Sequence, residues 1–249
     1  MLKVFFGGLT QFREGLWERP YCEAEPDIVV NLCQMLELPY PSERTLIYAV
    51  NAVTDGMMRT GLNSAGWAIV PQGFTVEHFV MFIKLYNEAL AEEGLEPFKM
   101  SAIYDAEPFN RFVKSASSDL LPTEFGAIHC PTGSVMYPED PSGRPFNLNY
   151  GEKLKWAEER GDSGIMSMAE VLYCLFLRPL LCWNRISFHK AHFICRDEWC
   201  NREASGRYLV HYSVGGGLDL ICAEDSPKRL NYDQLAVPRV FRSVPFESK

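Results

Sequence analysis

The chain has 249 residues, of which 47% are hydrophobic, and a formal net charge of −8 at pH 7. This length and composition allow a large buried core, which excludes an intrinsically disordered protein. Residues 1–177 hold 13 Lys and Arg against 24 Asp and Glu, whereas residues 178–242 hold 10 against 7. The sequence therefore predicts an acidic body with a mildly basic C-terminal end, and an excess this small does not indicate nucleic-acid binding.

The N-terminus and the cysteines bear on the cellular location. Residues 1–6 are mostly apolar, but Gly7 and Gly8 interrupt the run too early for a secretion signal, so we interpret it as a first strand. The eight cysteines are scattered, and several lie in apolar patterns where cysteine acts as a small hydrophobic residue. We therefore expect reduced thiols, a cytoplasmic location and no membrane partner.

Helix signals dominate the first two-thirds of the chain. Residues 27–36 follow Pro26 and carry apolar side chains on one side, which predicts a short helix. Ser42 begins a second pattern with helical spacing, although the T-L-I-Y-A-V segment within it is also compatible with a strand. Thr75 predicts the start of the longest helix, which ends at Glu93 before Gly94. Further predicted elements are an extended segment or strand over 66–74, a strand over 98–104, and helices over 105–115 and 152–160.

The stretch 121–150 is rich in proline and glycine and predicts irregular structure. A loop of this length is commonly functional, or it joins two domains. We therefore predict one compact domain over residues 1–249, with a subdivision in the loop 121–150 as the alternative.

The clearest helix signal runs from Ser167 to Pro179. Ser167 and Glu170 have the spacing of a capping box, in which each side chain accepts a hydrogen bond from a free N–H group of the first turn. The residues that follow are almost continuously apolar, so the helix is predicted to be buried on most sides. Pro179 is predicted to end it.

Beyond this helix the pattern changes to strands. Residues 185–195 and 207–214 alternate between two faces, and three glycines at 215–217 predict a hairpin that leads into residues 218–222. A last segment over 235–244 contains Pro238 and is predicted at a sheet edge. Helices first and strands last predict an α+β fold, with a mainly helical N-terminal two-thirds packed against a C-terminal antiparallel sheet.

Two groups of residues could support chemistry. His189, His192, Cys195 and Cys200 have the spacing H-x2-H-x2-C-x4-C, and all four are residue types that bind zinc. In a regular strand, however, His192 lies on the opposite face from His189 and Cys195, so the alternative is that these are ordinary strand residues. Cys130, in the irregular loop, is a candidate nucleophile, with a packed loop thiol as the alternative.

The leading functional hypothesis is a soluble intracellular binding or interaction protein without catalysis, whose partner is a protein or an anionic ligand. That partner is expected to contact the basic residues of the C-terminal end: Arg185, Lys190, Arg196, Arg202 and Arg207. The alternative is a hydrolase or transferase that uses Cys130 or a zinc ion held by the His and Cys set.

Overall fold

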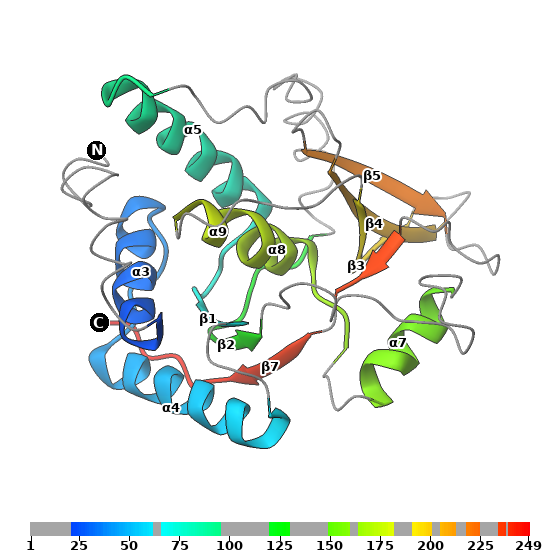
Figure 1. Ribbon diagram of the computed structural model, residues 1–249, viewed down its shortest axis with the longest axis horizontal. Coiled ribbons are helices and arrows are strands. Elements are labelled where there is room, and N and C mark those ends of the chain that lie inside the picture. The colour runs from blue at the N-terminus through cyan, green and yellow to red at the C-terminus, as the bar shows by residue number, and fades with distance from the viewer. Residues whose placement is uncertain are drawn as a thin grey trace.

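Among the described residues, the helices are mostly N-terminal and the strands pack against them (Figure 1). The computed structural model describes residues 21–61, 66–95, 120–129, 149–159, 164–181, 191–200, 205–212, 218–224, 234–237 and 239–249. The fold is of the predicted α+β class. The strands predicted over 1–6 and 98–104 and the helix predicted over 105–115 lie outside the described residues.

Within the described residues, four helices precede the core helix: α3 (Tyr21–Met35), α4 (Glu43–Thr60), α5 (Val76–Glu92) and α7 (Tyr150–Glu159). Ser42 and Thr75 cap α4 and α5 as predicted, because the side-chain oxygen of each accepts an N–H bond from three residues later. Gly94 has φ 70°, the left-handed conformation expected after a helix end. At 18 residues, α4 is one residue longer than α5, so the prediction that α5 is the longest helix was wrong.

The start of α3 differs from the prediction. It begins at Tyr21, and Pro26 lies inside the helix instead of before it. The buried Glu25 ties this part of the helix to the rest of the fold, since its Oε2 accepts the N–H of Ile69 at 3.1 Å. Such a tertiary contact offsets the destabilising effect of an internal proline.

A three-stranded antiparallel sheet has the order β1-β2-β7: β1 (Trp67–Val70), β2 (Gly126–His129) and β7 (Val240–Ser243). The extended segment predicted over 66–74 contains β1, and β7 lies at an edge as predicted. The central strand β2 lies in the stretch predicted to be irregular, so that prediction was wrong for residues 126–129. A segment this short is a strand here because it has a partner on both sides.

The second sheet has the order β5-β4-β3-β6: β3 (Ala191–Cys200), β4 (Ser205–Tyr212), β5 (Leu218–Glu224) and β6 (Gln234–Ala236). Strands β4 and β5 pair antiparallel, as the predicted hairpin requires. The edge strand β6 is the exception, because it runs parallel to β3. The pairing of β3 with β4 is irregular between Ile194 and Glu198.

The core helix consists of three continuous segments: α8 (Met168–Val171), the π-helical η4 (Leu172–Leu177) and α9 (Arg178–Leu181). The capping box of Ser167 and Glu170 is present as predicted. The prediction that Pro179 ends the helix was wrong, since the chain stays helical through Leu181. The Arg178 N–H bonds to the carbonyl of Tyr173, five residues back, and such a wider turn is one way a helix accommodates an interrupted bonding ladder.

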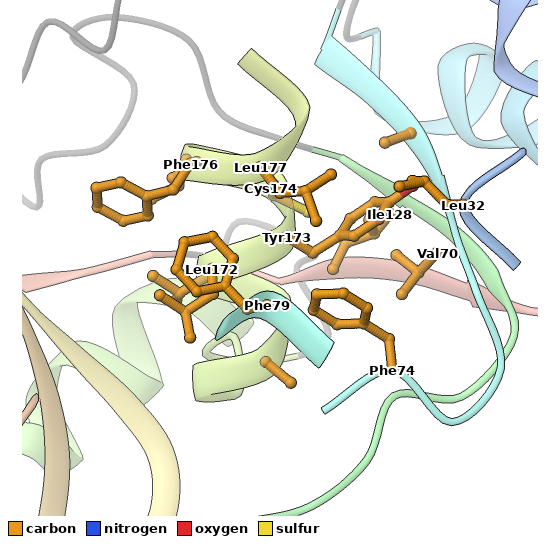
Figure 2. Packing of buried hydrophobic residues seen from close by; sticks show 14 of the residues in the cluster. Leu32, Val70, Phe74, Phe79, Ile128, Leu172, Tyr173, Cys174, Phe176 and Leu177 are labelled. Carbon is orange, nitrogen blue, oxygen red and sulfur yellow. The ribbon is translucent and has the colours of Figure 1, made fainter. Parts of the chain in front are cut away.

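The core helix is buried among elements from both halves of the chain. Figure 2 shows Leu172 beside Phe79 of α5 and Tyr173 beside Ile128 of the β1-β2-β7 sheet, and Leu32 of α3 belongs to the same buried cluster. Phe193 and Val210 of the second sheet join the same buried cluster. Its members therefore lie on both sides of the stretch 121–150, although a division of the chain there remains a prediction.

A smaller cluster lies on the other face of the second sheet. Ile194 of β3 and Leu209 of β4 pack there with Ile165 and with Tyr150 and Leu154 of α7. This sheet is thus a layer between the core helix and α7. None of the helices in the described ranges is long and apolar enough to cross a membrane.

Candidate functional site

Charged side chains gather where the core helix begins. Glu170, in the first turn, is 1% exposed and receives the Ser167 N–H on Oε2 at 2.8 Å. Its other oxygen, Oε1, receives Arg239 Nε at 2.8 Å and Arg196 Nη2 at 3.5 Å. One buried carboxylate therefore joins the core helix to β3 and to the segment before β7.

The two arginines differ in how firmly they are held. The Arg239 side chain is 10% exposed, and its guanidinium also lies 4.0 Å above the ring centre of Phe241. The Arg196 side chain is 31% exposed, about three times the exposure of Arg239. Because 3.5 Å is at the long limit for a hydrogen bond, Arg239 is the main counter-charge of Glu170.

Asp197 supports the same region from β3. Its Oδ2 accepts the Met168 N–H at 2.6 Å and its Oδ1 accepts the Leu121 N–H at 3.2 Å. Burial raises the pKa of Asp197, whereas these two N–H bonds and the positive charge of Arg196 act in the opposite direction. Asp197 therefore fixes the backbone beside Arg196.

Arg207 of β4 is held on three sides. Its Nη1 donates to the carbonyl of Arg196 at 2.6 Å, and its Nη2 lies 2.5 Å from Oε1 of Glu198. Its guanidinium also lies 4.1 Å above the ring centre of Tyr150 on α7. These contacts span the irregular part of the β3–β4 pairing and connect it to α7.

The structure brings together two of the five basic residues predicted to bind an anion, Arg196 and Arg207. Arg185, Lys190 and Arg202 lie outside the described residues. Sequence reasoning missed that Arg196 and Arg239 share Glu170 as a partner. The signal for Glu170 was present, because a capping-box glutamate before an apolar run becomes buried and then needs a counter-charge. Nothing in the sequence pattern indicated that Arg239 would supply it.

Only one member of the predicted zinc set, Cys195, has a described side chain. It is fully buried, its Sγ donates to the carbonyl of Phe193 at 3.6 Å, and burial raises its pKa well above the usual value. His189 lies outside the described residues, and the side chains of His192 and Cys200 on β3 are not described. Among the described residues, no three His, Cys, Asp or Glu side chains could hold a metal ion together. The zinc site remains a prediction.

The proposed nucleophile Cys130 also lies outside the described residues, directly after β2. The preceding residue, His129, is 7% exposed and packs edge-on against Trp67, with ring centres 5.4 Å apart. Burial lowers the pKa of His129 to about 4, so its imidazole is neutral at pH 7. The catalytic role of Cys130 remains a prediction.

No protein-family model, no curated protein and no solved structure matches this chain.

Proposed function

We propose that this chain is a binding protein that engages an anionic partner through the β3–β4 hairpin, with Arg196 as the side chain that contacts the partner. The observation that carries this proposal is the unequal sharing of Glu170. Arg239 holds the carboxylate at 2.8 Å, whereas Arg196 reaches it at 3.5 Å and is 31% exposed. Arg196 can therefore turn toward an external anion while Glu170 keeps its buried counter-charge.

The surroundings of Arg196 support this role. The backbone N–H of Arg196 donates to the carbonyl of Met166 at 3.0 Å, and the backbone carbonyl of Arg196 accepts a hydrogen bond from Nη1 of Arg207. These two bonds fix the backbone at Arg196. A fixed backbone beneath a partly exposed guanidinium reduces the backbone conformational entropy lost on binding. Guanidinium groups also match carboxylates and phosphates in a two-point geometry, which lysine does not.

The length of β3 narrows the proposed interface. Lys190 precedes the strand and Arg202 follows it, and a strand of ten residues is about 30 Å long. Of the five basic residues, Arg196 and Arg207 belong to the paired strands β3 and β4. We propose that the interface includes these two arginines together with Arg202, because Arg202 follows β3 by two residues in the sequence.

The cellular location is part of the proposal. Cys33 and Cys195 are free cysteines in the core, and burial raises the pKa of both thiols, that of Cys33 to about 12. Free cysteines in a core are typical of proteins from a reducing compartment such as the cytoplasm, where disulfides are rare. The alternative, a hydrolase or transferase that uses Cys130 or a zinc ion, remains an untested prediction.

Binding of a fluorescent polyglutamate peptide and of heparin, measured by anisotropy at several salt concentrations, tests the interface. We expect the affinity to fall with salt and Arg196→Gln to weaken it about tenfold, the value of one charge-assisted hydrogen bond. Arg44→Gln is the matched control, because Arg44 is an exposed arginine on α4, away from the hairpin, with a 67% exposed side chain. Salt-independent binding that Arg196→Gln and Arg202→Gln leave unchanged would refute the proposal.

A further inference from the structure

A second group of nitrogen-bearing side chains lies on the β1-β2-β7 sheet. Trp67 of β1 is paired directly with His129 of β2, and Arg242 of β7 is paired with Ala127, two residues from His129. Residues paired across a sheet, and residues two apart on one strand, lie on the same face. Trp67, His129 and Arg242 therefore share one face.

This face is the one covered by α4. A Cβ atom added to Gly56 of α4 would come within 2.5 Å of Cζ2 of Trp67, so the indole ring lies directly against that helix. The opposite face carries Val70 and Ile128, which lie beside Tyr173 of the core helix in Figure 2. The three nitrogen-bearing residues are thus separate from the Glu170 cluster and from the β3–β4 hairpin.

Two of these side chains have buried N–H groups without an acceptor. Within the described part of the chain, Trp67 Nε1 and Arg242 Nε are both buried and have no hydrogen-bond partner. Trp67 is fully buried, and His129 beside it is 7% exposed. A donor that has lost water and gained no acceptor destabilises the fold, so it indicates a site where another molecule can supply the acceptor.

We propose that this face of the sheet binds a small organic carboxylate, held by Arg242 and by the indole N–H of Trp67, with the imidazole of His129 as a third polar contact. The chemistry points to this class. A carboxylate has two oxygens in one plane, which suits a guanidinium on one side and a single N–H donor on the other. The neutral imidazole offers one further N–H donor.

The dimensions and the surroundings also fit a small molecule. Trp67 and Arg242 are two strands apart and also two residues apart in the pairing register. At about 4.8 Å per strand and about 3.4 Å per residue, their Cα atoms are about 12 Å apart, a separation that a tryptophan and an arginine side chain can close around one small ligand. The rest of the face is apolar, because Ile69, Ala127 and Val240 are buried. Trp67, Ile69 and Ala127 are fully buried and Arg242 is half-buried, which favours a small acid with a short apolar part over a macromolecule.

The test compares thermal unfolding of the protein in acetate, benzoate, phosphate and chloride at equal ionic strength. We expect saturable stabilisation by acetate or benzoate beyond that in chloride, because a ligand that binds only the folded state raises the unfolding temperature. Arg242→Gln should weaken the affinity about tenfold or more, whereas Arg44→Gln should leave it unchanged. The unfolding temperature of Arg242→Gln without ligand should not fall, because no bond to Nε is lost.

A second readout tests the site directly. We expect the ring resonances of His129, identified by their loss in His129→Gln, to shift when acetate or benzoate is added, and the shift to weaken in Arg242→Gln. Trp67→Phe, which keeps an aromatic ring but removes the N–H, should also weaken binding. The proposal is overturned if neither carboxylate acts beyond chloride, if phosphate alone acts, or if Arg242→Gln binds like the wild type.

Discussion

Gly56→Ala is the substitution for which the structure determines the sign of the effect. In the interior of a helix, alanine is more favourable than glycine by about 1 kcal/mol. At Gly56, however, the new Cβ would lie 2.5 Å from Cζ2 and 3.1 Å from Cζ3 of Trp67, whereas carbon atoms prefer about 3.5–4.0 Å. Because Trp67 is fully buried, the ring can move only by displacing its neighbours.

Overpacking of this kind usually destabilises a protein by about 1–3 kcal/mol, and a displacement of about 1 Å belongs in the upper part of that range. After the gain in helix propensity, we expect Gly56→Ala to lower the free energy of unfolding by about 1–2 kcal/mol. For a chain of this size the unfolding temperature should fall by about 2–8 °C, and calorimetry or urea denaturation measures either quantity.

Two comparisons make the test specific. Gly151→Ala in α7 is the matched control, because its new Cβ would meet only Asn149 Oδ1 at 3.4 Å, and we expect no loss of stability. In a Trp67→Phe background the outer ring is absent, so Gly56→Ala should be neutral or stabilising, with a coupling energy of about 1 kcal/mol or more. If Gly56→Ala stabilises the protein, or costs the same in both backgrounds, the packing argument is refuted.

The remaining predictions concern two capping boxes. His78 Nδ1 accepts the Thr75 N–H at 3.1 Å, and burial lowers the pKa of His78 from its usual 6.5. A lowered folded-state pKa means that the stability is present above the unfolded value of about 6.5 and is lost as the pH falls through the folded value. The denaturation midpoints at about pH 5 and about pH 8 should therefore differ less in His78→Gln than in the wild type, because glutamine keeps an acceptor at every pH. An equal difference between the two midpoints in both proteins would contradict this role of His78. Glu170→Ala leaves the buried Arg239 without its carboxylate, so it should lower the free energy of unfolding, measured by urea denaturation, by about 3–5 kcal/mol. Glu170→Gln should lose less, because the glutamine keeps an acceptor for the Ser167 N–H. Equal losses in the two variants would show that this cap contributes nothing to stability.

The features that sequence reasoning predicted are those encoded by a few adjacent residues. Ser42, Thr75 and Ser167 each cap a helix as expected, because the cap and the N–H group that it accepts are three residues apart. The antiparallel pairing of β4 with β5 was also predicted, since the glycines at 215–217 and the two strand segments are consecutive in the sequence.

The features that were missed depend on distant residues. Residues 126–129 contain Gly and Ala and carry little strand signal of their own, and they form β2 because β1 and β7 lie on either side. Pro179 carries a strong local signal to end the helix, but the buried position of the core helix and its π-helical turns override that signal. The Glu170 cluster was missed for the same reason, because Arg239 is close to it only in the folded chain.

The backbone groups of Ile69, at the edge of β1, are already hydrogen-bonded, which explains why neither binding proposal uses this edge. An exposed edge strand presents free N–H and C=O groups, which can add a strand from another protein. At Ile69 both groups are already bonded, the N–H to Glu25 at 3.1 Å and the carbonyl to the Tyr173 hydroxyl at 2.8 Å. Glu25 is itself paired with Arg178 of α9, and burial raises its pKa to about 8.

Because Tyr173 and Arg178 both belong to the core helix, this closure depends on the same element that carries Glu170. The helix therefore fixes an edge of one sheet through Tyr173 and the hairpin side of the other through Glu170. A strand-addition mode of binding at β1 would require both Ile69 bonds to break, each in a buried setting where an unpaired group costs about 1–3 kcal/mol. Binding through the side chains of Arg196 or Arg242 breaks no such backbone bond, which is the physical reason for assigning the two interfaces to them.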